Sequence, residues 1–207
     1  MSLLGTAFRW MADYEGPGAS LFRAMGTRMH RPLYPQVAAA LDLQADDRLL
    51  DVACGEGAFL AEQAAGVERV AGLDASATQV ASAGKRLADR VRAGSAEIVR
   101  GDAATLPWPD ETFTKVACMG SLEFMPAPVA VLAEMRRVLA SGGIAAVTMG
   151  YEGVEQREPG ERNAWGLPVW GDEPARTMMQ DAGFSDVAIT YVDWGGDSAR
   201  LVIGTKV

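Results

Sequence analysis

One segment of the chain reads Leu49-Leu50-Asp51-Val52-Ala53-Cys54-Gly55-Glu56-Gly57-Ala58-Phe59-Leu60. Residues 49–53 predict a buried strand, because they are apolar except for Asp51 just before the turn. Gly55 and Gly57 have no Cβ, so the turn can adopt positive φ angles and a ligand can approach its backbone closely. Residues 58–65 favour helix, and the N–H groups at the start of that helix should point toward whatever fills the turn.

A second carboxylate, Asp74, ends the next apolar segment and follows Asp51 by 23 residues. In a doubly wound sheet, this spacing places an acidic residue beside the ribose of a bound nucleotide. The two segments therefore predict a ligand that contains a nucleoside. The structural alternative is a strand, turn and helix in which the glycines serve packing alone.

The third glycine of a dinucleotide fingerprint is missing, because its position is occupied by Leu60. Asp51 and Glu56 also place two negative charges beside the turn, which would repel a pyrophosphate. These features favour a cationic nucleoside ligand over a nicotinamide dinucleotide, and an NAD(P)-dependent oxidoreductase becomes the less favoured alternative.

Composition limits the classes of protein to consider. The 207 residues suit one α/β domain, and the net charge of −8 argues against a nucleic-acid partner. No apolar run is long enough for a membrane span, and the N-terminus does not have the pattern of a signal peptide. Cys54 and Cys118 form no CxxC pair and His30 is the single histidine, so we expect no metal site and a reducing, cytoplasmic setting.

Strands and helices alternate along the chain. We expect strands at residues 96–100, 113–119, 144–149, 187–192 and 199–205, besides 49–53 and 70–73. We expect helices at residues 32–43, 77–91, 128–139 and 173–182, with a turn at residues 141–143. Alternation of this kind predicts a mainly parallel sheet, and the short connection at 195–196 predicts an antiparallel C-terminal pair.

The loop D-x-A-C-G-x-G-x-x-L resembles motif I of the class I S-adenosylmethionine (SAM) methyltransferases, especially the quinone-biosynthesis-like, methyltransferase-11-type branch. Residues 101–113, Gly-Asp-Ala-Ala-Thr-Leu-Pro-Trp-Pro-Asp-Glu-Thr-Phe, resemble a second segment of that family, and the likeness extends over about residues 41–147. It implies a Rossmann-like, seven-stranded, mostly parallel sheet with an antiparallel C-terminal pair and helices on both faces. Thr114 stands where family members often have Asp.

The resemblance also implies which residues bind SAM and release S-adenosyl-L-homocysteine. The turn contributes Asp51, Ala53, Gly55 and Gly57; the ribose side Asp74 and Ala75; the adenine side Asp102 and Ala103; and the methionine side the backbone of Met119 and Gly120. Asp74 suits two ribose hydroxyls because its two oxygens accept from both. The sequence Ala-Cys-Met-Gly-Ser at 117–121 differs from the N-P-P-Y pattern of enzymes that methylate amide or base nitrogens.

Methyl transfer to an oxygen or carbon acid can require a general base. The candidates are His30 and Glu123, and Tyr14 is a candidate for closing the site over the cofactor. Each has a structural alternative: His30 as an exposed or packing histidine, and Glu123 as a residue that is common at this place in relatives with different substrates. We expect His30→Ala and Glu123→Gln to retain SAM binding.

We expect a single domain over residues 1–207 that methylates a small, partly apolar acceptor, such as a secondary metabolite, a quinone or a lipid-like molecule. We expect residues 1–31 to form a helical lid or a part of the core. We expect residues 150–172 to form an irregular segment on the substrate side. A SAM-binding protein that catalyses another reaction, such as cyclisation, would keep every cofactor residue. The sequence does not choose between O-, N- and C-methylation and does not predict the oligomeric state.

Overall fold

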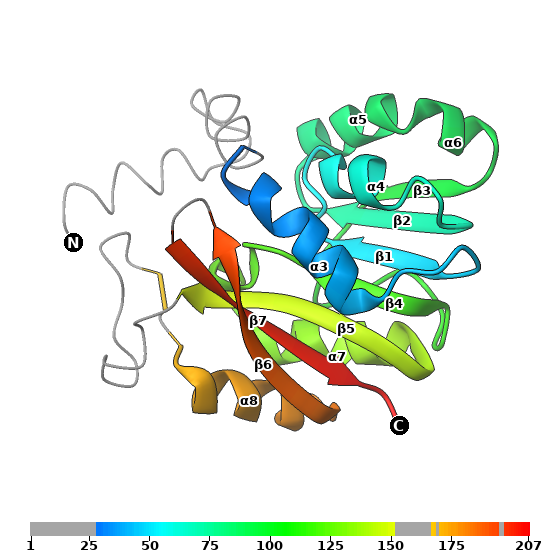
Figure 1. Cartoon of the computed structure of the whole chain (residues 1–207). Coiled ribbons are helices and arrows are strands. Elements are labelled where there is room, and N and C mark those ends of the chain that lie inside the picture. Colours follow the sequence, from blue (N-terminus) through cyan, green and yellow to red (C-terminus); the bar gives the residue numbers. More distant parts are fainter. Residues whose placement is uncertain (1–27, 152–166, 169, 195–196) are drawn as a thin grey trace.

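A computed structural model describes residues 28–151, 167–168, 170–194 and 197–207. Within them, seven strands form one sheet in the order β3-β2-β1-β4-β5-β7-β6 (Figure 1). The strands are β1 Arg48–Val52, β2 Arg69–Asp74, β3 Ala96–Arg100, β4 Phe113–Cys118, β5 Leu139–Tyr151, β6 Ser185–Trp194 and β7 Asp197–Thr205. Strands β1 to β5 run parallel, whereas β7 is antiparallel to both β5 and β6. The predicted fold class, including the antiparallel C-terminal pair, is confirmed.

Helices cover both faces of this sheet. They are η1 Arg31–Leu33, α3 Tyr34–Leu41, α4 Ala58–Gln63, α5 Ala77–Arg86, α6 Ala88–Arg92, η2 Leu122–Phe124, α7 Pro128–Val138 and α8 Asp172–Asp181. Apolar side chains of α3 and α4 share one buried cluster, and those of α7 and α8 share the other. The cluster with α3 and α4 also contains Leu49 of β1. Because side chains alternate along a strand, Asp51 points to the same face of the sheet as Leu49.

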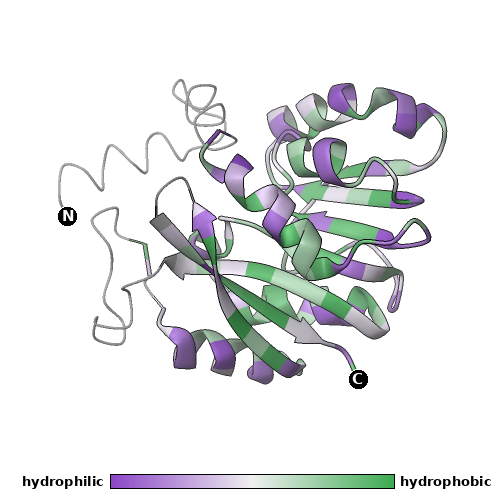
Figure 2. Cartoon of the chain, in the orientation of Figure 1, coloured by the Kyte–Doolittle hydropathy of each residue, from purple (hydrophilic) through white to green (hydrophobic). Residues whose placement is uncertain are grey.

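Alternation along the strands divides the core into these two layers. Leu49 belongs to the layer with Val37 of α3, whereas Leu50 and Val52 belong to the layer with Leu132 of α7. Figure 2 shows the central strands as mostly apolar ribbons and the outer sides of α5 and α8 as strongly polar. Hydrophobic burial on both faces holds the parallel strands in register, and their carboxyl ends therefore meet at one edge.

Several predicted boundaries were wrong. The helix predicted at 77–91 is divided at Leu87, and α3 ends at Leu41 because Asp42 adopts a left-handed φ of 48°. Residues 141–143, predicted as a turn, belong to β5. There Leu139 pairs with Phe113, and the Gly142 N–H donates to the Lys206 carbonyl at 2.7 Å, so the strand begins early.

The predicted lid and the irregular segment are only partly described. Residues 1–27, which include Tyr14, and residues 152–166 and 169 lie outside the described residues. Described residues of both segments lie near the carboxyl edge of the sheet, since His30 packs on Gly120 and the Trp170 carbonyl accepts from Arg200. None of the helices in the described ranges combines the length and the apolar character that crossing a bilayer requires.

Candidate functional site

Most of the predicted cofactor residues lie in a row along the carboxyl edge of the sheet. The register places Val52 beside both Leu73 and Cys118, and Asp74 beside Arg100. The loops that follow β3, β2, β1 and β4 are therefore neighbours in that order (Figure 1). Along this edge the order of predicted contacts is adenine side, ribose side, motif I turn and methionine side, which is the order of the parts of one extended nucleoside ligand.

The turn after β1 has the backbone that its glycines predicted. Gly55 and Gly57 have φ angles of 54° and 71°, and Ala53 also has a positive φ, 60°. Gly57 is the N-cap of α4, and a Cβ there would lie 3.1 Å from the Cβ of Ala83 in α5. A side chain at Gly57 would therefore meet both an unfavourable φ and a packed helix. Strain of this kind is concentrated at ligand sites.

Asp74 joins the turn to the end of β2. One carboxylate oxygen accepts from the Gly55 N–H at 2.9 Å, and the other accepts from the Ser76 N–H at 2.9 Å. Burial raises the pKa of Asp74, and these two N–H groups oppose that rise. Each oxygen keeps a further lone pair, so the carboxylate can hold the turn and still accept from two hydroxyl groups.

Asp51 is a buried carboxylate that has neither a hydrogen-bond donor nor a counter-charge among the described residues. It is 2% exposed, and within the described residues no side chain or backbone group donates a hydrogen bond to it. Burial raises the pKa of Asp51 well above its usual range, and the nearby negative charge of Asp74 raises it further. A buried charge without a partner is strongly unfavourable, so this position suits a cation supplied from outside the chain.

Glu56 differs from Asp51 in this respect. Its carboxylate pairs with Arg86 of α5 at 3.0 Å, and the Arg86 Nε also donates to the Glu56 carbonyl at 3.0 Å. Much of the Glu56 charge is therefore balanced within the protein. Of the two acidic residues, Asp51 is therefore the one without a counter-charge among the described residues, and its attraction for a cation stays a prediction.

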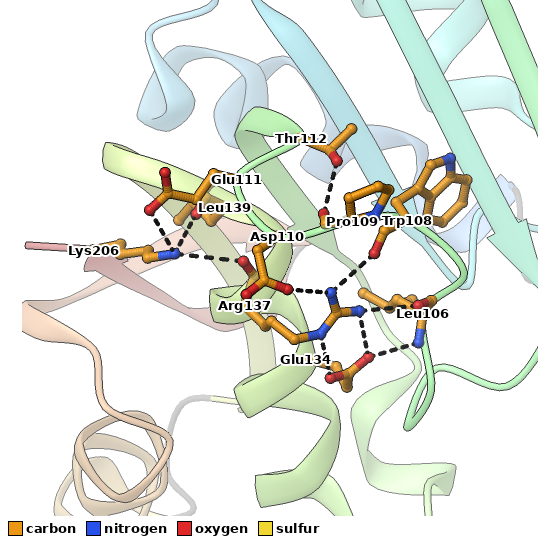
Figure 3. Close-up of polar contacts among 10 residues, drawn as sticks. All are labelled: Leu106, Trp108, Pro109, Asp110, Glu111, Thr112, Glu134, Arg137, Leu139 and Lys206. Carbon is orange, nitrogen blue, oxygen red and sulfur yellow. Dashed lines mark hydrogen bonds and ion pairs between the residues drawn. The ribbon is translucent and has the colours of Figure 1, made fainter.

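Asp102 lies in a loop that is fastened at its far end. Its carboxylate accepts from the Ala104 N–H at 2.9 Å, while the neighbouring Ala103 N–H has no acceptor among the described residues. Further along, Arg137 of α7 donates to the carbonyls of Leu106 and Trp108. Figure 3 shows this guanidinium enclosed by the loop and by two carboxylates.

Glu134 and Asp110 are those two carboxylates. Glu134 binds Arg137 at 2.7 Å and also accepts from the Leu106 N–H at 2.8 Å, and Asp110 lies 2.8 Å from Arg137. The bond from Arg137 is the main cause that lowers the pKa of Glu134. The loop that carries Asp102 is thus fixed to α7 through charged hydrogen bonds.

The backbone after β4 lies against His30. Gly120 has a φ of 58°, and a Cβ built on it would lie 2.2 Å from Nε2 of His30. The Gly120 N–H donates to the Thr148 hydroxyl at 2.7 Å, and the Met119 carbonyl accepts from the Ser121 hydroxyl at 3.1 Å. His30 also stacks on Trp194 of β6, with ring centroids 6.0 Å apart.

Glu123 lies in η2, one turn beyond Gly120, and is partly buried. Its carboxylate accepts from the Gly150 N–H of β5 at 2.7 Å. Burial raises the pKa of Glu123, and the Gly150 N–H lowers it. A carboxylate whose pKa is raised binds a proton more readily than an exposed one, which suits a general base.

Three contributors to this edge were not predicted from the sequence. Tyr34 of α3 is 7% exposed, and the pKa of its hydroxyl is raised by burial and then by the negative charges of Asp51 and Glu62. Thr148 fixes Gly120, and fully buried Arg200 binds the end of β5. The segment Arg31-Pro32-Leu33-Tyr34-Pro35 gave a helix start but no signal for a site, and a threonine or arginine inside a strand gives none either.

Residues 50–147 match the family described as "Methyltransferase domain". The chain is 36% identical over 104 residues to the 2-phytyl-1,4-naphtoquinone methyltransferase of Synechococcus elongatus, which covers 49% of this chain and 45% of that relative. This chain therefore spans about half the length of that relative.

Two solved structures share the fold at lower identity. The structure of the cyclase SpnF has a TM-score of 0.67 and 23% identity, and covers 95% of this chain and 86% of that chain. The geranyl diphosphate C-methyltransferase of Streptomyces coelicolor, in complex with Mg²⁺, geranyl diphosphate and S-adenosyl-L-homocysteine, has a TM-score of 0.71 and 15% identity, and covers 96% of this chain and 88% of that chain.

Proposed function

Because the chain belongs to the class I SAM-dependent methyltransferases, we propose that it binds SAM and transfers its methyl group to a small, partly apolar acceptor. The observation that carries this proposal is the buried Asp51 carboxylate, which has no donor among the described residues and lies in the row of strand ends. SAM is a cationic nucleoside without phosphate, so its charges suit this position. A pyrophosphate would meet repulsion from Asp51 and Asp74.

The residues of this edge fit the parts of SAM. Asp74 accepts from the ribose hydroxyls, with Ala75 beside it, and Asp102 accepts from the adenine amino group beside the Ala103 N–H. Ala53, Gly55 and Gly57 allow close approach of the turn, and the backbone of Met119 and Gly120 faces the methionine part. When bound, SAM supplies an electrophilic methyl group on a sulfonium. Tyr34 is a further polar group near Asp51.

On the acceptor side, the chain positions its reactant and removes a proton. Glu123 holds its carboxylate on the Gly150 N–H and serves as the base, because burial raises its pKa toward the working range. His30, stacked on Trp194 and packed on Gly120, forms a wall of the same space. Alignment of the acceptor and exclusion of water supply the rest of the rate enhancement.

We further propose that residues 1–31 and 150–172 enclose the acceptor within one domain over residues 1–207, with Tyr14 closing the site. Gln36 fastens the start of α3 to β6, because its side chain donates to the Asp193 carbonyl at 2.8 Å and accepts from the Asp193 N–H at 2.9 Å. A reducing compartment such as the cytoplasm agrees with the free thiols of Cys54 and Cys118, both buried.

The test is to measure SAM binding by calorimetry and then to incubate the protein with methyl-labelled SAM and a fractionated extract of small molecules. We expect SAM and S-adenosyl-L-homocysteine to bind and label to appear in an apolar product. Tight NADH binding without SAM binding would refute the cofactor assignment.

A second candidate is a SAM-binding enzyme that does not methylate. The likeness to the cyclase SpnF supports this candidate at the level of the fold alone. The same incubation separates the two functions, because a cyclase would convert its substrate while the label stays in SAM.

A further inference from the structure

The antiparallel pairing of β5 with β7 is interrupted beside Glu123. Thr148 pairs with Leu201 and Tyr151 pairs with Ala199, so two residues of β5, Met149 and Gly150, stand opposite the single residue Arg200. This is the geometry of a β-bulge, and the φ of 71° at Gly150 agrees with it. At a bulge, backbone groups leave the ladder and become available to side chains.

Both polar groups of one peptide in this bulge are taken by charged side chains. The Met149 carbonyl accepts from Nη1 of Arg200 at 3.1 Å, and the Gly150 N–H donates to Glu123 at 2.7 Å. These groups belong to the same peptide unit and point in opposite directions, since the described residues contain no cis peptide bond. A guanidinium therefore acts on one end of the peptide dipole and a carboxylate on the other.

We propose that Arg200 is a positioning residue that orients Glu123 and stabilises its ionised form through the Met149–Gly150 peptide. This inference rests on the proposed function, in which Glu123 is the base. The positive guanidinium draws electron density toward the carbonyl oxygen, which strengthens the N–H as a donor to Glu123. No proton crosses the peptide; the effect is polarisation and fixed geometry.

The surroundings of Arg200 support a role in orientation. It is 0% exposed and also binds the Asp172 carboxylate at 2.6 Å, the Trp170 carbonyl at 2.6 Å and the Tyr191 hydroxyl at 3.2 Å. A Cβ at Gly150 would lie 3.4 Å from Nη1 of Arg200, so the guanidinium packs closely against the bulge. These contacts from the described residues hold the guanidinium in one orientation.

The other ionisable groups around Glu123 come from several elements. Cys118 of β4 is buried, and the pKa of its thiol is raised by burial and by the charges of Asp51 and Glu123. His30 packs on Gly120, and Asp172 and Tyr191 surround Arg200 on the far side of the peptide. Arg200 is the cation that the described structure connects to Glu123 by hydrogen bonds.

The test follows the ionisation of Glu123 by NMR, with ¹⁵N-labelled glycine and arginine in the protein without ligand. We expect the Gly150 N–H resonance and a guanidinium resonance of Arg200 to shift with one common midpoint as pH rises. In Glu123→Gln neither should show this transition. An Arg200 guanidinium that shows no transition at the Glu123 midpoint would overturn the proposal.

A substitution gives the second measurement. We expect Arg200→Met to raise the Glu123 midpoint by about half a pH unit and Arg200→Lys to restore part of the difference. Arg136→Met is the matched control, because Arg136 donates to the Gly183 carbonyl away from the bulge. Equal midpoints in wild type and folded Arg200→Met would contradict the proposal. If neither Arg200 variant folds, the wild-type titration decides alone.

These measurements require neither cofactor nor acceptor. A protein that fails to transfer label yet shows the common midpoint would refute the proposed function and leave the positioning role of Arg200 intact. A protein that transfers label while Arg200 does not respond to Glu123 would do the reverse.

Discussion

The two halves of the carboxyl edge are built in different ways. After β2 and β3, carboxylates accept from backbone N–H groups two residues further on, as Asp74 does from Ser76 and Asp102 does from Ala104, and Asp74 also accepts from the Gly55 N–H in the turn after the neighbouring strand β1. At the ends of β4, β5 and β6, the contacts join distant residues, such as His30 with Gly120 and Arg200 with Met149. The cofactor half is a set of local motifs, whereas the acceptor half depends on tertiary contacts.

The halves also differ in charge. Asp51 has no counter-charge among the described residues, whereas Arg200 on the acceptor side is paired with Asp172. The hydrogen bond from Arg200 is the main cause that lowers the pKa of Asp172. The cofactor half is therefore electrostatically incomplete without a cation, and the acceptor half is largely balanced within the protein. Variants should weaken SAM binding when they alter the first half and spare it when they alter the second.

The largest effect is expected at Asp74. In Asp74→Ala the N–H groups of Gly55 and Ser76 both lose their acceptor, and the ribose hydroxyls lose theirs. The lost N–H bonds lower stability, whereas each ribose hydroxyl left without an acceptor in the complex costs about 1–3 kcal/mol of binding, so we expect SAM affinity to fall by a factor of about 100 or more. Calorimetric titration with SAM measures this loss. Asp74→Asn, which keeps one acceptor oxygen, should lose less, and an affinity near that of wild type in Asp74→Ala would remove Asp74 from the site.

Asp51→Asn should weaken SAM binding by about tenfold and stabilise the protein without ligand. The pKa of Asp51 is raised in the folded state, so the folded protein holds this proton more tightly than the unfolded chain does. Stability therefore falls as pH rises from about 4 through the raised folded pKa, and Asn removes this fall. At pH 7 we expect Asp51→Asn to raise the free energy of unfolding by about 1–3 kcal/mol, with a smaller gain in acid.

Urea unfolding of both proteins across this pH range measures the difference. Asp47 offers a matched control, since it is 7% exposed and accepts from the Gln44 N–H and the Thr114 hydroxyl. Asp47→Asn should therefore destabilise the protein by about 1–2 kcal/mol. If Asp51→Asn were destabilising to the same extent, Asp51 would have an internal partner and the electrostatic contrast between the two halves would disappear.

The cofactor half was largely predictable because its information is local. Gly55 and Gly57 predict a turn directly after β1, and Asp74 predicts an acceptor at the end of β2. The register of the parallel sheet brings these two strand ends together. Thr114, where the family often has Asp, donates to Asp47 at 2.6 Å just before β1, so it lies at the opposite end of the sheet.

The acceptor half was not predictable to the same degree, because its contacts connect residues far apart in the chain. The sequence around Gly150 does not predict that β5 bulges opposite Arg200, and the sequence around Gln36 does not predict its hydrogen bonds to Asp193. The charge balance of Glu56 was missed for the same reason, since Arg86 approaches from another helix. His30 and Glu123 were proposed from their residue types alone, and their partners are visible only in the fold.

Arg137 lies at the remote end of the cofactor half and should have a moderate effect. Arg137→Met removes the donors to the Leu106 and Trp108 carbonyls, so we expect a loss of about 2 kcal/mol in the free energy of unfolding. SAM affinity should fall only about threefold, because Asp102 keeps its own bond to the Ala104 N–H. Chemical unfolding and calorimetry measure the two quantities, with Arg136→Met as control.

The pH dependence of this variant gives a further check. The pKa of Glu134 is lowered mainly by its bond from Arg137, so this contribution is present above the unfolded pKa and is lost as pH falls through the folded pKa. Arg137→Met should therefore lose less stability than wild type on acidification over that window. An unchanged acid dependence would mean that the Glu134–Arg137 pair does not fix the loop in solution.

His30→Ala and Glu123→Gln should change SAM affinity least, by no more than about twofold. Glu123→Gln keeps an oxygen that can accept from the Gly150 N–H, so the backbone after β4 should stay in place. Methyl transfer should fall strongly in Glu123→Gln because the amide cannot take a proton, and the acidic limb of the pH–rate profile should be lost with it. In His30→Ala the wall formed with Trp194 opens, which should raise KM for the acceptor more than it lowers kcat. Loss of SAM binding in either variant would place that residue in the cofactor half, and the division of the edge at Gly120 would then be wrong.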